Sequence, residues 1–250
     1  WRAEAPTSKS FDMYTFSRGE YVKSMEEDAK AEAISKVLYP ADDHIEGKRL
    51  RLKQQYFFVS ASLQTIIRDH LRNHESLDSL PEHAVIHIND THPALCVPEL
   101  MRILLDECGY EWENAWEITC RTLAYTNHTV MSEALERWDL NLFREHLPRI
   151  TKIIEEIDRR FCKDVFEFHP EKRNQLSSMA IIGDGQVRMA NLCVIACFSV
   201  NGVSKLHSDI LKEDLFKDYN DIFPGKLTNV TNGIAARRWL CQGNPLLTSY

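Results

Sequence analysis

The sequence lacks the patterns that mark several common classes of protein. No apolar run reaches the roughly 18–20 residues of a membrane-spanning helix, and the polar opening Trp1-Arg2-Ala3-Glu4 has no apolar signal-peptide core. No Gly-x-Gly-x-x-Gly, P-loop or Gly-x-Ser-x-Gly pattern occurs. Basic residues are outnumbered, since 30 Lys and Arg face 37 Asp and Glu, for a formal net charge of −7. This balance argues against a nucleic-acid partner and against binding to an anionic membrane.

Cysteine and histidine give no clear metal or disulfide framework. The seven cysteines form no Cys-x-x-Cys pair, and most lie in apolar, periodic segments where free Cys acts as a small hydrophobe. A reducing, cytoplasmic location is therefore expected. Cys193 and Cys197 share a helix face, which leaves a metal or redox pair as the alternative to core packing. His70 and His74 share another face, but no third ligand is evident, so the sequence predicts no metal site.

What the chain does have is an alternation of strand-like and helix-like segments. Its 250 residues, 44% of them hydrophobic, suit one large domain or two small ones. Buried strands are expected at residues 84–88, 121–125 and 199–203, and before 228–233. Long helices are expected at 48–73 and 148–166. This pattern predicts an α/β fold with a largely parallel sheet and helices on both faces.

Two shorter segments allow more local predictions. Gly183-Asp184-Gly185, flanked by Ala180-Ile181-Ile182 and Gln186-Val187-Arg188, is typical of a hairpin turn. Ser132-Glu133-Ala134-Leu135-Glu136 resembles a capped helix start, so a helix is expected there. Glu133 and Glu136 could form a glycosidase pair. Their spacing on one expected helix instead favours a surface or supporting role.

Three polar strings follow the strand-like runs: residues 89–93 (Asn-Asp-Thr-His-Pro), 125–129 (Tyr-Thr-Asn-His-Thr) and 229–233 (Asn-Val-Thr-Asn-Gly). Amides, imidazoles and carboxylates can share hydrogen bonds with many hydroxyl groups at once. Open α/β sheets bind their ligands at the carboxyl ends of strands. The strings therefore indicate a protein that handles sugars.

Each of these candidate residues has a structural alternative. Asp90 could cap the next helix while His92 packs beside it. His128 could be a buried histidine whose hydrogen bonds are all satisfied. Asn232-Gly233 could be an ordinary turn. From the residues alone these alternatives stay open.

Longer strings resemble one family. They are Ile88-Asn89-Asp90-Thr91-His92-Pro93, the run from Ala124 to Trp138, Val200-Asn201-Gly202-Val203 with Leu206-His207-Ser208, and Asn229 to Ile234 followed by Arg237-Arg238-Trp239. All are similar to glycogen (α-glucan) phosphorylases, and the resemblance covers essentially the whole chain. The missing initiator methionine and the abrupt last residues also suggest a piece of a longer protein, referred to below as the parent.

The resemblance implies an architecture and a reaction. The parent would have two Rossmann-like domains of the GT-B type, and residues 1–232 would form the later part of the N-terminal domain. Residues 233–250 would begin the crossover into the C-terminal domain. The parent would cleave the terminal α-1,4 bond of a glucan with inorganic phosphate, giving α-glucose 1-phosphate. It would use pyridoxal phosphate bound outside this chain, and a homodimer is expected.

The resemblance also assigns residues. It places the catalytic histidine at His128, whose ring would meet the glucose 6-hydroxyl and whose carbonyl would face the anomeric carbon. Asn232 matches the asparagine that binds the 4- and 6-hydroxyls. Asp90 and His92 match residues beside the reacting sugar, and Thr129 lies next to that pocket. The chain would supply one wall of the cleft, contain no cofactor-binding or metal residues, and be inactive alone.

Two departures and two competing functions qualify this interpretation. Ala235-Ala236 replaces the family's Thr-Pro, and Lys152, Glu155 and Asp158 replace the Gln, Tyr and Asn of a glycogen storage site. Glycogen anchoring on that surface is therefore in doubt. The competing functions are a non-catalytic glucan-binding module and a transferase that uses a sugar nucleotide.

Overall fold

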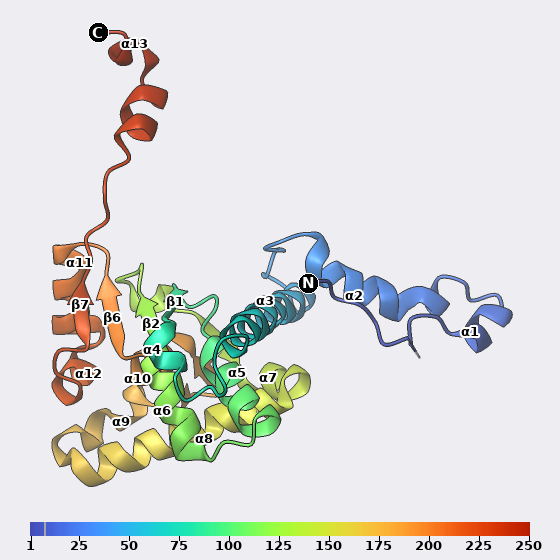
Figure 1. Ribbon diagram of the computed structural model, residues 1–250, viewed down its shortest axis with the longest axis horizontal. Helices are drawn as coiled ribbons and strands as arrows, with labels where there is room; N and C mark the ends of the chain where they lie inside the picture. The colour runs from blue at the N-terminus through green and yellow to red at the C-terminus, as the bar shows by residue number, and fades with distance from the viewer. Residues whose placement is uncertain (8) are drawn as a thin grey trace.

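A four-stranded parallel sheet organises the body of the protein (Figure 1). The computed structural model describes residues 1–7 and 9–250. The strands are β1 (Ile86–Asn89), β2 (Leu123–Thr126), β6 (Ser199–Gly202) and β7 (Leu227–Asn229), in the order β1-β2-β6-β7. Neighbouring strands all pair in parallel, which confirms the predicted α/β class with its parallel sheet.

Strand β2 is central and buried at all four positions, as expected for a parallel strand covered on both faces. The register brings the strand ends into line, because Asn89 pairs with Thr126, Thr126 with Asn201, and Gly202 with Asn229. The segments that follow β1, β2 and β7 therefore leave the sheet at the same edge. These are the segments that carry the three polar strings.

Helices surround this sheet in the predicted alternation. The helices of the body are α3 (Ile45–Leu71), α4 (Leu80–His83), α5 (Cys96–Arg102), α6 (Trp112–Thr122), α7 (Leu140–His146), α8 (Pro148–Phe168), α9 (Leu176–Met179), α10 (Met189–Ala196), α11 (Lys205–Ile210) and α12 (Lys217–Ile222). Two π-helical segments, η2 (Ile103–Glu107) and η5 (Leu211–Leu215), extend α5 and α11, and a 3-10 segment, η4 (Pro170–Gln175), precedes α9. The expected long helices are α3 and α8, each within a few residues of its predicted bounds.

Helix α8 illustrates why these segments fold as they do. Ile150, Ile153, Ile157, Phe161 and Val165 recur at helical spacing, and all are buried against the body. His44 is the N-cap of helix α3, and its side chain accepts a hydrogen bond from the Gly47 N–H. One hydrophobic core joins these helices to the sheet.

A buried carboxylate ties α3 to α5 within this core. Glu99 is 0% exposed and accepts hydrogen bonds from the Tyr56 hydroxyl (2.9 Å) and the Ser60 hydroxyl (2.7 Å). Arg102 binds both of its oxygens at 2.8 and 2.9 Å. Burial, and then the nearby Glu99 charge, raise the pKa of Tyr56 to about 12.

A second, antiparallel sheet has the order β3-β5-β4. Its strands are β3 (Arg137–Asp139), β4 (Ile182–Gly183) and β5 (Gln186–Arg188). The predicted hairpin is confirmed, since Gly183 pairs with Gln186 across Asp184 and Gly185. Both turn residues have positive φ, 53° and 71°, which suits the tight two-residue turn.

The helix expected from Ser132 is wrong. Residues Ser132–Ala134 form only a 3-10 turn, η3, without a side-chain cap, and the chain then enters β3. Trp138 is 5% exposed between two exposed neighbours, Arg137 and Asp139, so this triplet alternates as a strand does. Pairing with β5 overrides the local helix signal.

Two segments extend from this body (Figure 1). The first holds α1 (Met13–Ser17), η1 (Lys23–Met25) and α2 (Glu26–Lys36), and the second holds η6 (Arg237–Gln242) and α13 (Pro245–Thr248). Every residue from 229 to 250 is exposed, including the apolar Trp239, Leu240 and Leu246. Among the described residues, no helix combines the length and apolar character needed to cross a membrane.

Candidate functional site

The turn after β1 presents Asp90 in a constrained conformation. Asp90 has φ of 61°, in the left-handed region that few non-glycine residues occupy. Its N–H donates to the Thr126 carbonyl (2.9 Å), and its Oδ1 accepts from the Thr91 N–H (2.6 Å). Such conformations persist where the surroundings hold them, often at functional sites. The capping alternative is wrong, because α5 starts six residues later with Leu95 at its N-cap.

His128 follows β2 and is exposed, so the alternative of a buried histidine is also wrong. Its Nε2–H donates to Asn89 Oδ1 at 2.6 Å. Asn89 ends β1, so the hydrogen bond joins the ends of two neighbouring strands. The imidazole is thereby held at the edge of the sheet with one ring nitrogen fixed as a donor.

A buried network fixes the backbone around His128. Asn127 is 0% exposed, donates to the Tyr125 hydroxyl (3.0 Å) and accepts from the Thr129 N–H (2.9 Å). His207 Nδ1 accepts from the Val203 N–H (3.2 Å), so its Nε2–H is the donor to Asn127 Oδ1 (3.1 Å) and the Thr129 carbonyl (3.2 Å). The side chains of Asn127 and His207 therefore hold the peptide groups of residues 127–129 in place.

The segment after β7 is held by β6 and α11. Ser208 donates to Asn229 Oδ1 (2.9 Å), and the Asn232 N–H donates to the Val203 carbonyl (2.9 Å). Gly202 makes room for this contact, because a Cβ there would lie 2.5 Å from Ser208 Oγ. Residues 231–235, all of them described, run without a turn, so the Asn-Gly turn alternative is wrong. Asn232 is exposed.

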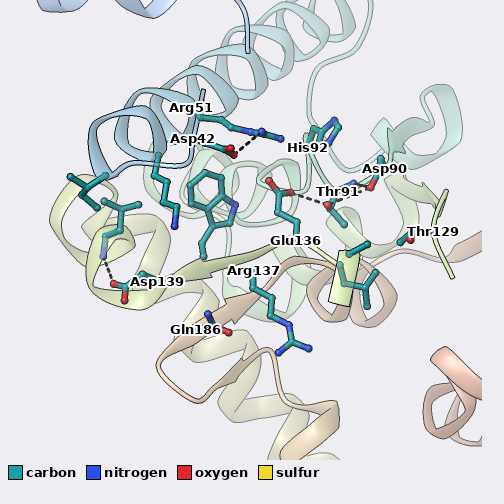
Figure 2. Close-up of a pocket in the computed structure, with 16 residues that line it drawn as sticks. Asp42, Arg51, Asp90, Thr91, His92, Thr129, Glu136, Arg137, Asp139 and Gln186 are labelled. Atoms are coloured by element: carbon teal, nitrogen blue, oxygen red, sulfur yellow. Dashed lines mark hydrogen bonds and ion pairs between the residues drawn. The ribbon is translucent and has the colours of Figure 1, made fainter. Parts of the chain in front are cut away.

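A cavity of about 610 Å³ opens beside these strand ends (Figure 2). Of the five predicted site residues, Asp90, His92 and Thr129 line it, whereas His128 and Asn232 do not. The Tyr39 hydroxyl lies 3.4 Å from His92 Nδ1. The structure thus gathers three of the five in one cavity and places the other two elsewhere along the same sheet edge.

Charged groups from α3 and β3 form another side of the cavity. Arg51 pairs with Asp42 at 2.8 Å, and its guanidinium lies over the Tyr39 ring. Lys48 and Arg137 also line the space. Acidic and basic groups are therefore mixed, which suits a neutral ligand rich in hydroxyl groups better than a strongly charged one.

The match to known proteins decides the family. The family model for carbohydrate phosphorylases matches residues 1–250. The chain belongs to the carbohydrate phosphorylase family. A glycogen phosphorylase of Bacillus subtilis (strain 168) is 54% identical over 220 residues, covering 88% of this chain and 28% of that protein. A glycogen phosphorylase of Synechocystis is 46% identical, covering 100% and 29%, and the muscle form of Bos taurus is 46% identical, covering 98% and 30%.

This carbohydrate phosphorylase chain therefore spans about 30% of the length of these relatives. The sequence analysis did not assign Asn89, Asn127 or His207 to the site, and it gave Glu136 a surface or supporting role. All four residues lie within the strings that resemble the family, and Asn89 and Asn127 also lie in the polar strings after the strands. The contact between Asn127 and His207 joins residues 80 positions apart, so no local pattern contains it.

Three of the seven cysteines of this family member, Cys96, Cys193 and Cys197, are buried in the core, whereas Cys108 and Cys241 are exposed. Cys193 and Cys197 are both 0% exposed, and burial raises the pKa of each thiol well above its usual range. A thiol with a raised pKa is a poor nucleophile and a poor metal ligand. Core packing, the favoured interpretation, is confirmed.

His70 and His74 acquire a third neighbour, His83. The ring centroids of His70 and His74 lie 4.2 Å apart, as do those of His74 and His83, and both pairs are stacked. Stacked rings do not direct three nitrogens at one point. Among residues 1–7 and 9–250, no group of three or more His, Cys, Asp or Glu side chains is arranged to hold a metal ion.

This histidine stack predicts a local pH dependence. Burial, and then His83 and His70, lower the pKa of His74. The folded state therefore prefers neutral His74, so local stability is complete above the unfolded value of about 6.5. It falls as the pH drops below that value. In the parent, amide protection factors of residues 71–85 should decrease between pH 7.5 and 5.5.

Two variants make this prediction specific. His74→Gln should flatten the pH dependence of protection in residues 71–85, because the titrating group is gone. His169→Gln, a histidine at the end of α8 outside the stack, should leave it unchanged. An equally steep loss of protection in the His74 variant would contradict the prediction.

Proposed function

We propose that the parent is an α-1,4-glucan phosphorylase, a glycosyltransferase. It would cleave terminal glucose from glycogen, starch or maltodextrin with inorganic phosphate, giving α-glucose 1-phosphate. The observation that carries the proposal is the row of Asn, Asp and His side chains at aligned strand ends, in a chain of the carbohydrate phosphorylase family. This chain would form one wall of the catalytic cleft and be inactive alone.

In this proposal His128 is the catalytic residue. Its ring would donate to the glucose 6-hydroxyl, and its backbone carbonyl would face positive charge developing at the anomeric carbon. The hydrogen bonds of Asn127 and His207 to the flanking peptide groups support this role, because they fix the local dipoles before any substrate arrives. A fixed dipole aimed at developing charge is a strong catalytic effect.

The remaining site residues would bind substrate. Asp90, His92 and Thr129 would meet the sugars on either side of the scissile bond, which their shared cavity supports. Asn232 would bind the 4- and 6-hydroxyls of the reacting glucose. Two observations support this role. The Asn232 backbone is held by its hydrogen bond to the Val203 carbonyl, and its side chain is exposed and can contact a ligand.

The surface of α8 is left out of the proposed glucan contacts. Glu155 accepts from Arg144 (2.8 Å), and Asp158 accepts from the Ile181 N–H (2.6 Å). These two positions correspond to storage-site residues in the resemblance, yet both carboxylates already have partners. Like the residue types at these positions, the pairings argue against glycogen anchoring on this surface.

The architecture of the parent is part of the proposal. It would have a two-domain GT-B fold, with residues 1–232 in the N-terminal domain and 233–250 in the crossover. The exposed, protruding segment with Trp239, Leu240 and Leu246 supports this, because further protein would cover such apolar groups. A homodimer rests on the resemblance alone. A cytoplasmic location is supported by an Arabidopsis thaliana relative named as cytosolic.

Pyridoxal phosphate is the proposed cofactor of the parent, where it would supply a phosphate group for proton transfer. The residues of this chain do not fit it. Lys48 is the one lysine that lines the described cavity, and it is exposed on the first turn of α3, a poor setting for an imine-forming amine. Lys226 donates instead to the Val194 and Ile195 carbonyls. The cofactor would therefore be held by the rest of the parent.

The experiment that tests the function is phosphorolysis of a maltooligosaccharide by the parent. Release of glucose 1-phosphate that requires inorganic phosphate is the expected result. Binding of the sugar by folded protein without any release would favour the glucan-binding module. Turnover that requires a sugar nucleotide would favour the other competing function, a transferase that uses such a donor.

Asn232→Ala should weaken the use of glucose 1-phosphate in the synthetic direction. Two substrate hydroxyls would lose their amide partner, and kcat/KM should fall by an amount equivalent to about 1–3 kcal/mol. Initial rates against glucose 1-phosphate concentration measure this. Asn220→Ala on α12, away from the sheet edge, serves as the matched control. Unchanged efficiency in the Asn232 variant would refute its assignment.

A further inference from the structure

Glu136 joins three parts of the protein at the wall of the candidate cleft. Its carboxylate accepts from Gln55 Nε2 (2.9 Å) on α3 and from Thr91 Oγ1 (2.8 Å) after β1. Its backbone carbonyl accepts from the Met189 N–H (3.2 Å) at the start of α10. Both side-chain donors are neutral groups, and hydrogen bonds from neutral donors to a carboxylate are stronger than those between two neutral groups.

The supports of Glu136 are rigid. Gln55 is 7% exposed on the long helix α3, and the residue after Glu136 begins β3, which pairs with β5. Glu136 is therefore fixed both by its own backbone and by a buried amide. A side chain held in this way can fix the position of a third group.

That third group is Thr91. Thr91 is 2% exposed, and its N–H donates to Asp90 Oδ1, so two successive hydrogen bonds through Thr91 link Glu136 to Asp90. Figure 2 shows this chain of contacts from Glu136 through Thr91 to Asp90. Since Asp90 holds a left-handed conformation, it needs surrounding contacts to keep it there.

We propose that Glu136 is a positioning residue that holds Thr91, and through it the left-handed Asp90, in the wall of the substrate cleft. It acts through Thr91, whose hydroxyl donates to its carboxylate. The role deepens the proposed function and rests on it for its catalytic consequence. Its structural consequence, an ordered turn at residues 90–92, does not depend on that function.

Glu136→Ala in the parent tests the catalytic consequence. A loosened Asp90 should lower kcat/KM for the maltooligosaccharide by on the order of 10-fold, because small displacements of binding groups are costly. The loss should fall mainly on KM for the glucan, whereas KM for inorganic phosphate should stay within about twofold. Equal changes in both KM values would point to general disruption and overturn the proposal.

A conservative variant, Glu136→Gln, separates the effect of the hydrogen bonds of Glu136 from the effect of its charge. Gln55 Oε1 is buried without a hydrogen-bond partner, so a rotated Gln55 amide could accept from the new amide of Glu136→Gln. The single amide oxygen of the new side chain would still accept from the Thr91 hydroxyl. Glu136→Gln should therefore recover most of the efficiency lost in Glu136→Ala. A Gln variant as impaired as the Ala variant would contradict a tethering role.

Two further variants complete the set. Glu133→Ala, on the same loop but exposed and hydrogen-bonded to the neighbouring Ser132 hydroxyl, should behave as wild type. Thr91→Val should lower efficiency on its own and add little to Glu136→Ala, because the two residues act in series. Additive losses would show that Glu136 does not act through Thr91.

Hydrogen exchange gives a readout that needs no activity. In Glu136→Ala, the amides of residues 90–92 should exchange about 10-fold faster than in wild type, while amides of α8 keep their protection. Unchanged exchange at 90–92 would overturn the proposal even if activity fell. If the wild-type parent has no phosphate-dependent activity, the proposed function fails. The exchange result still shows whether Glu136 holds Thr91 and Asp90 in position.

Discussion

Replacing His128 with alanine in the parent should lower turnover on maltooligosaccharide by about 100- to 1,000-fold, with little change in thermal stability. In the proposed mechanism the imidazole is a preorganised donor to the reacting sugar, and losing one such donor costs about 3–4 kcal/mol of transition-state stabilisation. Stability should hold because the ring is exposed and its one hydrogen bond is to Asn89. Steady-state kinetics and calorimetry on the same preparation measure both quantities.

His169→Ala provides the matched control for this result. It removes a surface imidazole at the end of α8, where the partner is Glu171, and should leave turnover unchanged. Asn89→Ala should give a smaller loss than His128→Ala, because it frees the ring without removing it. A His128 variant with normal turnover and a lowered melting temperature would contradict the catalytic assignment.

Replacing Glu99 with alanine should destabilise the N-terminal part of the parent by about 3 kcal/mol. Removing one partner of a buried ion pair leaves the other charge without compensation. Here Arg102, 19% exposed at its side chain, would lose both Glu99 contacts, and the Tyr56 and Ser60 hydroxyls would lose their acceptor. Amide exchange in α5 and the first calorimetric transition measure the effect.

Glu107→Ala tests whether the burial of Glu99 is the cause of the stability loss expected for Glu99→Ala. Glu107 also binds Arg102 (2.7 Å), but its side chain is 43% exposed. Exposed ion pairs contribute at most about 1 kcal/mol, so this variant should lose far less stability. Equal losses in the two variants would show that the buried position of Glu99 is not what makes it important.

Local patterns determined much of the fold. The periodic apolar stripe of α8, the Asp184-Gly185 turn and the β-branched run of β1 each predicted an element that the structure confirms. These signals succeed because a helix face, a tight turn and a buried strand are specified by residues that lie near one another in the sequence. The polar strings at strand ends also predicted that the sheet edge would carry a candidate site.

The same local reasoning was wrong at residues 132–139. Ser132 followed by Glu133 and Glu136 has the composition of a helix start, yet the segment forms η3 and then β3. The deciding contact is the pairing of Trp138 with Val187, 49 positions away, which buries the indole in the core. Local propensity is weaker than such tertiary pairing.

The sequence by itself determined the alternation of strands and helices around the parallel sheet, the family, and which polar residues follow the strands. The tertiary structure alone decided how those residues are held. Glu136 meets Thr91 across 45 positions, His207 meets Asn127 across 80, and His83 joins the stack of His70 and His74. The physical reason is that hydrogen bonds between distant segments depend on strand register and helix packing, which no short window of sequence contains.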